Sequence, residues 1–232
     1  MHSFHPLGDS AIIVHFDGDS SSEIHGKIVS LASMLQGSEL DGFLEAVPSY
    51  TTLTIHYNPL LIGKDDPYEY VCRQVDLLIK KLPAHTDLAG RQVDIPVCYG
   101  GDFGPDLDYV ASYHNLSVQE VIAIHMEPIY PVYFLGFSPG FPYLGGLLPK
   151  LETPRKETPR KTIPKGSVGI AGRQTGIYPL GSPGGWQIIG QTPLRLFSIN
   201  QDSPALLQPG DNIRFYPISR QQFMDWGKED GN

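Results

Sequence analysis

A serine between glycines is the first feature of this sequence that points to a known chemistry. Gly136-Phe137-Ser138-Pro139-Gly140 matches the G-x-S-x-G pattern, in which a serine at the end of a strand attacks a carbonyl carbon. That mechanism requires a helix after the serine and a backbone N–H donated by the next residue, but the next residue here is Pro139, which has no N–H. The pattern therefore predicts a tight turn that packs Phe137 and Phe141, and not a nucleophile.

A second candidate is the glycine-rich segment 166–176, GSVGIAGRQTG, which suggests a phosphate-binding loop. A Walker loop has the pattern G-x-x-x-x-G-K-[ST] between a strand and a helix, whereas Arg173 and Gln174 follow Gly172 here and the next element has an extended pattern. If the protein takes part in ATP chemistry, it does so without a Walker loop. Backbone N–H groups beside Arg173 leave a small carboxylate or phosphate site as one interpretation, and glycines that only form tight turns are the one we favour.

Positive charge gathers in residues 150–173 of a chain that is acidic as a whole. This stretch has seven basic and two acidic side chains, a balance of +5 that leaves -13 for the rest of the chain. The near-duplicates TPRKE and TPRKT lie within it, and their prolines predict a long extended loop. Two interpretations stay open: the loop is a solvated cationic surface, or Arg155 and Arg160 bind a carboxylate or phosphate of a ligand or of a partner protein.

His125 is the histidine best placed for acid–base chemistry, since it ends a predicted helix and precedes an aromatic strand. A helix C-terminus favours the protonated imidazole, which suits a structural role as readily as a catalytic one. Because no acid or nucleophile is identified beside it, we favour the structural role and keep catalysis as the alternative. For Phe141 and Trp186 we favour core positions, with a contact between subunits as the alternative for Trp186, which follows Gly184-Gly185.

The composition of the chain limits the functions that these residues can have. The chain has 232 residues and a formal net charge of -8, which argues against the broad cationic surface that DNA or RNA binding needs. It has no apolar run near the roughly 20 residues of a membrane span and no export signal in its first residues, so we expect a cytoplasmic protein without membrane contact. Cys72 and Cys98 have no partners at zinc-like spacing, so we expect neither a metal site nor a disulfide.

Residues 1–85 have the pattern of a small α/β domain. The expected elements are a strand at 11–16, a helix from the capping box Ser20-x-x-Glu23 to Gly37, strands at 43–47 and 50–57, and a helix from Asp66-Pro67 to Pro83. Both helices carry apolar residues along one face. Together these elements suffice for a two-layer domain, followed by a hinge expected in 83–90.

Residues 86–232 have the pattern of a β-rich domain. The stretch from Gly136 to Gly190 holds 12 of the 25 glycines and 8 of the 21 prolines, together with many aromatic residues, which predicts tightly turned and packed β structure. Short helices are expected after Pro105, after the capping box Ser117-x-x-Glu120, and after Pro217. The expected strands are 92–99, 130–135, 167–171, 186–189, 194–197 and 212–216. Because closure removes the exposed edges of so many short strands, we expect a closed or nearly closed barrel.

Long strings of this sequence resemble a known family. They are LGDSAIIVHF near the start, then YGGDFGPDLDYVA, YPVYFLGFSPGFPYLGGL, TPRKETPRKTIPKGSVGIAGRQTGIYPLGSPGGWQIIGQTPLRLF and LLQPGDNIRFYPI. On these strings, which follow in order over nearly the whole chain, the protein resembles the KipI family, also called the allophanate hydrolase subunit 1 family or the family of 5-oxoprolinase B subunits (PxpB-like). The resemblance implies an α+β fold, a small N-terminal α/β domain followed by a cyclophilin-like β-barrel domain, and it does not imply prolyl isomerisation.

The resemblance also implies an activity that needs partners. Members look like one half of a pair with the 5-oxoprolinase C subunit, of the KipA or allophanate hydrolase subunit 2 type, and the pair joins the A subunit to open 5-oxoproline to glutamate with ATP. We therefore expect a non-autonomous hydrolase subunit, inactive alone, that shares a cleft with the C subunit; membership of a urea carboxylase or allophanate hydrolase system is an alternative. The residues implied for that cleft are His125, Gly136, Phe137, Pro139, Gly140, Phe141, Tyr143, Arg155, Arg160, Arg173, Gln174, Thr175, Tyr178, Pro179 and Trp186.

Some members of the family are described instead as inhibitors of a sporulation histidine kinase, so a kinase is a second expected partner. We favour the enzyme subunit, because the polar and glycine-rich matches concentrate in the predicted barrel and a module that only binds a kinase has no need of them. If the family's cleft is present, Arg173 and His125 are expected to open onto a common groove of the barrel.

Overall fold

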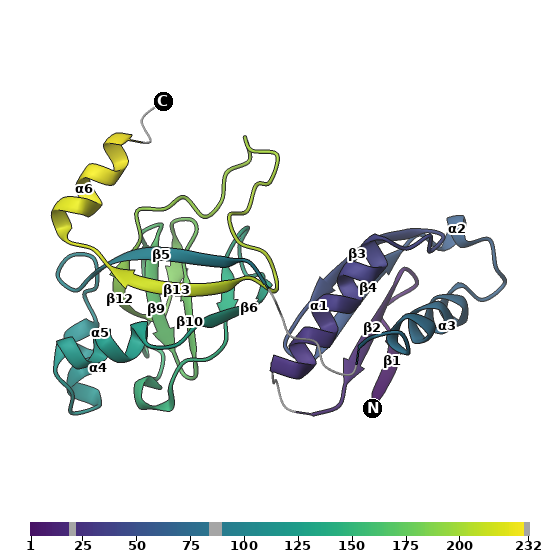
Figure 1. The fold of residues 1–232 in the computed structure, drawn as a ribbon, viewed down its shortest axis with the longest axis horizontal. Coiled ribbons are helices and arrows are strands. Elements are labelled where there is room, and N and C mark those ends of the chain that lie inside the picture. The colour runs from purple at the N-terminus through teal and green to yellow at the C-terminus, as the bar shows by residue number, and fades with distance from the viewer. Residues whose placement is uncertain (19–21, 84–89, 230–232) are drawn as a thin grey trace. The chain divides into compact units, whose positions relative to one another are not determined.

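The computed structural model describes residues 1–18, 22–83 and 90–229, and the chain divides into two compact units, Met1–Ala89 and Gly90–Asn232 (Figure 1). The first unit is a sheet covered by helices, and the second is a closed β-barrel with short helices. The expected α+β class, with a small α/β domain before a barrel, is confirmed. The expected boundary between residues 85 and 86 falls in 84–89, outside the described residues.

In the N-terminal unit, antiparallel strands run in the order β1-β2-β4-β3, and helices cover one face of the sheet (Figure 1). The elements are β1 His2–Pro6, β2 Ala11–Phe16, α1 Ser22–Gln36, β3 Phe43–Pro48, β4 Thr52–Tyr57, α2 Pro59–Ile62 and α3 Pro67–Ile79. Ile12, Val14, Leu53 and Ile55 alternate along β2 and β4 and are buried together with Val71 of α3. The period of two in the sequence thus marks the face that the helices cover.

The start of α3 was predictable from its capping residue. Asp66 accepts a hydrogen bond from the backbone N–H of Glu69 at 2.9 Å, as the sequence predicts. The helix ends at Ile79 and does not continue to Pro83. The capping residue Ser20 expected for α1 lies outside the described residues, and β1 and α2 were not predicted. β1, with the sequence HSFHP, has no run of β-branched residues, and it forms by pairing with β2.

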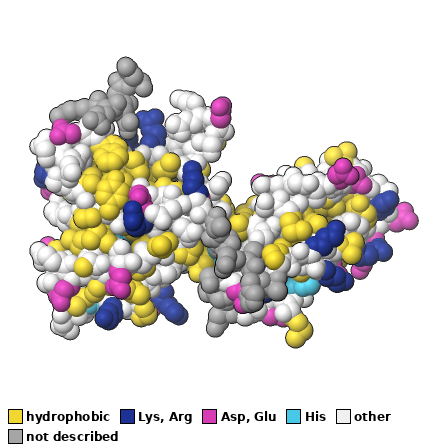
Figure 2. Space-filling model, viewed as in Figure 1, with side chains coloured by type: hydrophobic (Ala, Val, Ile, Leu, Met, Phe, Trp, Pro, Cys, Tyr) yellow, Lys and Arg dark blue, Asp and Glu magenta, His cyan; other side chains and the backbone are white. Residues whose placement is uncertain are grey.

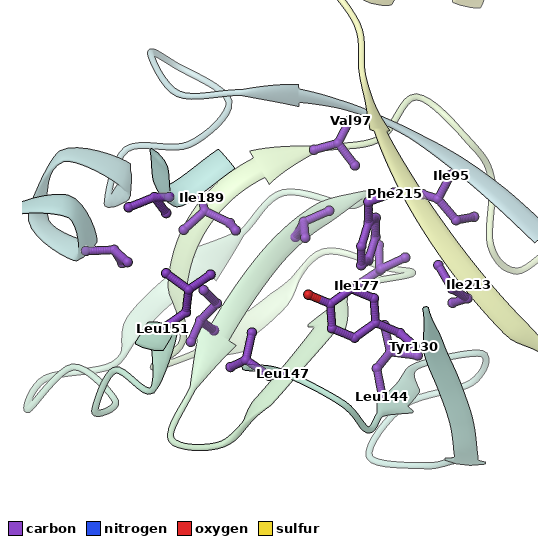
Figure 3. Close-up of a cluster of buried hydrophobic side chains, with 14 of the residues drawn as sticks. Ile95, Val97, Tyr130, Leu144, Leu147, Leu151, Ile177, Ile189, Ile213 and Phe215 are labelled. Carbon is purple, nitrogen blue, oxygen red and sulfur yellow. The ribbon is translucent and has the colours of Figure 1, made fainter. Parts of the chain in front are cut away.

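The barrel of the C-terminal unit closes in the order β10-β7-β6-β13-β5-β12-β9. Its strands are β5 Gln92–Tyr99, β6 Tyr130–Leu135, β7 Pro142–Leu144, β9 Ser167–Ala171, β10 Gln174–Ile177, β12 Gln187–Gln191 and β13 Asn212–Pro217. β13 pairs with β5 in parallel, and the remaining pairs of the barrel are antiparallel. Figure 3 shows the buried side chains inside, among them Ile95, Tyr130, Ile177, Ile213 and Phe215. Closure of the barrel, which the sequence predicted, is confirmed.

Short helices accompany the barrel: α4 Leu107–Tyr113, α5 Val118–Met126 and α6 Arg220–Glu229. The capping box at Ser117 and Glu120 forms as predicted, with each side chain bonded to the backbone N–H of the other residue. Leu107, Val110 and Val121 join the barrel core, so α4 and α5 cover part of it. Among the described residues, none of the helices is long and apolar enough to cross a bilayer.

Two expectations for the C-terminal unit are wrong. Residues 194–197 form no strand; they belong to a loop from 192 to 211 in which Phe197 makes an isolated bridge with Ala205. The near-duplicate strings at 153–162 are not one extended loop, because β8 Arg160–Ile163 begins within them and pairs with β11 Ser182–Gly184. Proline disfavours only the interior of a strand, and Pro159 stands just before β8, where a missing N–H interrupts no ladder.

Candidate functional site

The loop between β6 and β7 is built from two consecutive turns. The Ser138 N–H donates to the Gly136 carbonyl at 2.7 Å, which makes Phe137 the centre of a three-residue turn with φ +65. The Phe141 N–H then donates to the Ser138 carbonyl, with Pro139 next and Gly140 at φ +78, the arrangement of a type II β-turn. The element directly after Ser138 is the strand β7 and not a helix. The predicted tight turn is present, and Ser138 is not positioned as a nucleophile.

Aromatic rings gather beside this loop. We call Phe141, Tyr143, Tyr178 and Trp186 the aromatic cluster; Phe141 is edge-on to both Tyr178 and Trp186, with ring centroids 5.3 and 5.5 Å apart. Phe141, Tyr178 and Trp186 are buried, as we favoured for Phe141 and Trp186. Phe137, which is outside this cluster, meets Phe141 edge-on with ring centroids 5.5 Å apart, but its side chain is 66% exposed.

Glycines on the neighbouring strands make room for these rings. A Cβ on Gly184 would lie 2.4 Å from the Tyr178 hydroxyl oxygen, and a Cβ on Gly176 would lie 3.0 Å from Trp186. Both glycines therefore serve the close approach of backbone and aromatic rings. Burial raises the pKa of Tyr178 to about 12, although the nearby charges of Arg155 and Arg160 act to lower it. The Tyr178 hydroxyl thus keeps its proton at neutral pH.

A buried carboxylate ties the basic stretch to the barrel. Asp106 Oδ1 accepts from Arg160 Nη2 at 2.6 Å and from Lys156 Nζ at 3.1 Å, while Oδ2 accepts from the backbone N–H of Ile188 at 2.7 Å. Burial acts to raise the pKa of Asp106, but the hydrogen bonds from Arg160, Ile188 and Lys156 outweigh it, and the pKa is lowered. Asp106 is therefore a carboxylate at neutral pH.

This ion pair corrects the expectation that Arg160 is free to bind a ligand or partner anion. Its Nη2 is occupied by Asp106, and its buried Nη1 has no hydrogen-bond partner within the described part of the chain. Arg155, by contrast, is exposed, and its charge acts on the Tyr178 hydroxyl. Of the two arginines in the near-duplicate strings, Arg155 is the one that faces solvent beside the aromatic cluster.

Arg173 lies on the turn between β9 and β10, next to Gly172, whose φ is +56. Arg173 is exposed, and Gly172 bridges to Thr153, which joins this turn to the start of the basic stretch. Gln174 begins β10 and is half-buried. The glycine-rich segment thus forms strands and turns, as we favoured, while Arg173 keeps an accessible charge near the basic stretch.

His125 lies in the barrel interior and reaches no surface. Its Nδ1 is 2.9 Å from the Tyr99 hydroxyl and its Nε2 is 3.0 Å from the Thr175 hydroxyl. Burial lowers the pKa of His125 to about 3, so the expectation of a protonated imidazole at the helix end is wrong: desolvation outweighs the helix dipole. The expected common groove with Arg173 is wrong for the same reason, since His125 is fully buried.

Sequence reasoning missed Asp106 and His114. The first follows Pro105 at a helix start, where the sequence marks only a cap, and its cationic partners lie 50 and 54 residues away. The second shares a hydrogen bond with the buried Thr153 hydroxyl at 3.0 Å and so fixes the start of the basic stretch against α4. The sequence offered little signal for either residue, because Asp102, Asp108 and Asn115 are further polar residues of the same segment.

Four of the candidate residues are exposed on the barrel unit. They are Phe137, Pro139, Arg155 and Arg173. Phe137 and Pro139 precede β7, beside the C-terminal end of β10, whereas Arg173 precedes β10 at its other end. Figure 2 shows apolar and basic side chains next to each other on the face of the unit in view. A shallow pocket in the N-terminal unit, lined by Phe4, Cys72 and Leu77 among others, contains none of the candidates. The arrangement offers aromatic surface and positive charge, which suits a ligand or partner that carries a carboxylate.

Comparison with known proteins covers nearly the whole chain. Residues 2–207 match the family model described as carboxyltransferase domain, subdomain C and D. The B subunit of 5-oxoprolinase from Bacillus subtilis (strain 168) is 42% identical over 232 residues, which are 97% of this chain and 96% of the relative. The protein of the same name from Haemophilus influenzae is 42% identical over 210 residues, 90% of this chain and 95% of the relative.

Solved structures share the fold. The crystal structure of TTHA0988 superposes with a TM-score of 0.77 at 39% identity and covers 90% of this chain but only 40% of its own. The conserved uncharacterized protein PH0987 from Pyrococcus horikoshii has a TM-score of 0.57 at 43% identity over 95% of this chain and 100% of its own. The K. lactis urea amidolyase, at 19% identity and a TM-score of 0.75, covers 97% of this chain and shares its fold over 15% of a much longer chain.

Proposed function

The chain belongs to the family of carboxyltransferase domains, subdomains C and D, and we propose that it is the B subunit of an ATP-dependent 5-oxoprolinase, which hydrolyses 5-oxo-L-proline to L-glutamate. One observation carries this proposal. Three bacterial relatives named as B subunits of 5-oxoprolinase are 39–42% identical to this chain and match it over 94–96% of their own length. In sequence, the urea amidolyases of Lachancea kluyveri and Saccharomyces cerevisiae match only 25% and 50% of this chain, so the substrate of a urea-processing system is the weaker alternative.

The geometry supports a subunit that holds part of a site. Opening a lactam requires attack on its carbonyl carbon and stabilisation of the charge that develops on the oxygen. Arg155 offers an exposed positive charge beside the aromatic cluster, and it acts on the buried Tyr178 hydroxyl. Ser138 and His125 do not fit the roles of nucleophile and base, because one precedes a proline in a turn and the other is buried with both nitrogens bonded. We place the groups that activate the substrate on another subunit.

The partners in this proposal are a 5-oxoprolinase C subunit, of the KipA or allophanate hydrolase subunit 2 type, and an A subunit. The coverage of the solved structures supports a partner of this kind, because TTHA0988 and the K. lactis urea amidolyase carry this fold as 40% and 15% of a longer chain. In those proteins the fold is joined covalently to further protein. In the proposed complex, the C subunit makes the same association with the fold of this chain.

ATP is a substrate of the assembled complex in this proposal. The glycine-rich segment folds into β9, β10 and the turn between them, and no helix follows Gly172 as a Walker loop requires. We therefore assign nucleotide binding to another subunit. Arg155 and Arg173 then serve the carboxylate of 5-oxoproline rather than a phosphate chain.

Reconstitution tests the function. The purified chain is mixed with the A and C subunits from the same organism, and loss of 5-oxoproline and release of ADP are followed with each protein left out in turn. We expect turnover only in the complete mixture and none with this chain alone. Full turnover without this chain refutes the proposal, and turnover of urea in place of 5-oxoproline assigns the chain to the alternative system.

A further inference from the structure

Phe137 holds a backbone conformation that a large side chain rarely adopts. Its φ of +65, with the 2.7 Å hydrogen bond from the Ser138 N–H to the Gly136 carbonyl, defines a three-residue turn of the strained type. The type II turn that follows and the hydrogen bond from the Gly136 N–H to the Phe141 carbonyl at 3.1 Å fix the loop on both sides. Glycine would fit this position without strain, so the phenylalanine is kept there at a cost in stability.

The ring that this turn presents points away from the core. Phe137 is 66% exposed and touches the aromatic cluster only edge-on, through Phe141. A side chain that served packing would be buried, as Phe141 is. A rigid and exposed aromatic residue is instead typical of an anchor that enters a pocket on another protein, because little conformational entropy is lost on binding.

A second exposed apolar side chain lies on the loop that packs against this turn. A Cβ on Gly140 would lie 3.0 Å from Phe197 Cβ, so the β6–β7 loop and the 192–211 loop are in direct contact. Two residues beyond Phe197, Ile199 is 79% exposed. Arg195 lies on the same loop and is exposed. We call Phe137, Ile199 and Arg195 the two-loop patch.

We propose that the two-loop patch is the surface on which the C subunit docks, with the Phe137 ring in an apolar pocket that carries carboxylates at its rim. This inference rests on the proposed function. The rim is argued from charge complementarity, since Arg195 on the patch and Arg155 beside the aromatic cluster are exposed cations on the barrel unit. Docking here sets the partner against the aromatic cluster and Arg155, and so completes the site.

The test measures, by calorimetry, how tightly the full chain binds the purified C subunit, and it follows thermal unfolding of the chain alone. Phe137→Gly is expected to raise the melting temperature of the free chain by about 2–5 °C, because it releases the turn, and to weaken binding about thirtyfold, as expected for an interface anchor. If Phe137 served folding alone, Phe137→Gly would lower both the melting temperature and the affinity. Arg195→Glu is expected to weaken binding and to reduce the dependence of the affinity on salt concentration. Ile129→Ala removes another exposed apolar side chain, at the other end of β6, and is the matched control.

The outcomes are distinct. Binding of Phe137→Gly and Arg195→Glu with wild-type affinity overturns this inference and leaves the proposed function intact, whereas absence of binding by the wild-type chain removes both. Vesicles of phosphatidylserine and phosphatidylcholine form a further arm, because exposed apolar tips near basic residues also suit a lipid surface. Loss of vesicle binding by Phe137→Gly with unchanged affinity for the C subunit assigns the patch to a membrane and overturns the inference.

Discussion

Replacing Asp106 with asparagine tests whether a buried carboxylate holds the basic stretch to the barrel. Breaking a fully buried ion pair by removing one partner costs about 3–5 kcal/mol. The Asp106 side chain is 5% exposed, but Arg160 and Lys156 are 27% and 32% exposed and can regain water, and the asparagine oxygen can still accept from the Ile188 N–H. We therefore expect Asp106→Asn to lower the free energy of unfolding by about 2 kcal/mol and the melting temperature by about 4–8 °C.

The pH dependence of this effect has a definite sign. The pKa of Asp106 is lowered in the folded chain from its ordinary value of 3.8, so the stability it contributes is present above that value and is lost as the pH falls through the folded pKa. Urea unfolding of the wild type and the variant should differ by the same amount from about pH 5 to 8 and converge below about pH 4.

The control for this prediction is Asp102→Asn, four positions away. Asp102 is 80% exposed in its pair with Arg220, and an exposed pair contributes about 0–1 kcal/mol. Equal unfolding free energies for the two variants at pH 7 would refute the assignment of Asp106 as the residue that fixes the basic stretch.

Three other substitutions have effects that the same geometry predicts. Because burial lowers the pKa of His125 to about 3, the unfolded chain binds one more proton than the folded chain as the pH falls below about 6.5. His125→Gln should therefore remove up to about 1.4 kcal/mol per pH unit from the slope of the unfolding free energy against pH, measured by urea titration between pH 6 and 4. An unchanged slope would mean that His125 is hydrated. Gly184→Ala should lower the unfolding free energy by about 1–3 kcal/mol, since the new Cβ would lie 2.4 Å from the Tyr178 hydroxyl oxygen. Gly181→Ala is the control and should change the unfolding free energy little, because the nearest atom to its Cβ would be 3.7 Å away. Equal losses for the two variants would contradict the packing. Arg155→Ala should raise the KM for 5-oxoproline in the reconstituted complex about tenfold and leave the melting temperature of the chain unchanged. Lys161→Ala, which removes another exposed cation, should leave the KM unchanged. The same KM for both variants would remove Arg155 from the site.

The elements that the sequence predicted are those whose signals are local. The caps at Asp66 and Ser117 act within a single helical turn, and the strands of the N-terminal sheet carry a period of two that survives in the structure. The short strands β8 and β11 could not be predicted, because proline and glycine obscure the strand pattern and only their pairing makes them strands.

The site was less predictable than the fold, because its character depends on contacts between distant residues. Arg160 and Asp106 are 54 positions apart, so the sequence offers no reason to pair them. His125 was placed correctly at the end of a helix, but its protonation depends on the closed barrel around it. Residue type and spacing identified the aromatic and basic side chains, and the tertiary structure decides which of them reach solvent.

If this chain carries an incomplete site that a partner chain closes, amide hydrogen exchange with and without the C subunit reveals it directly. We predict slower exchange in the loops at 136–141 and 153–160 when the partner is present, and unchanged exchange in α1 and α3. Protection confined to the N-terminal unit, with both loops exchanging as in the free chain, would contradict this prediction.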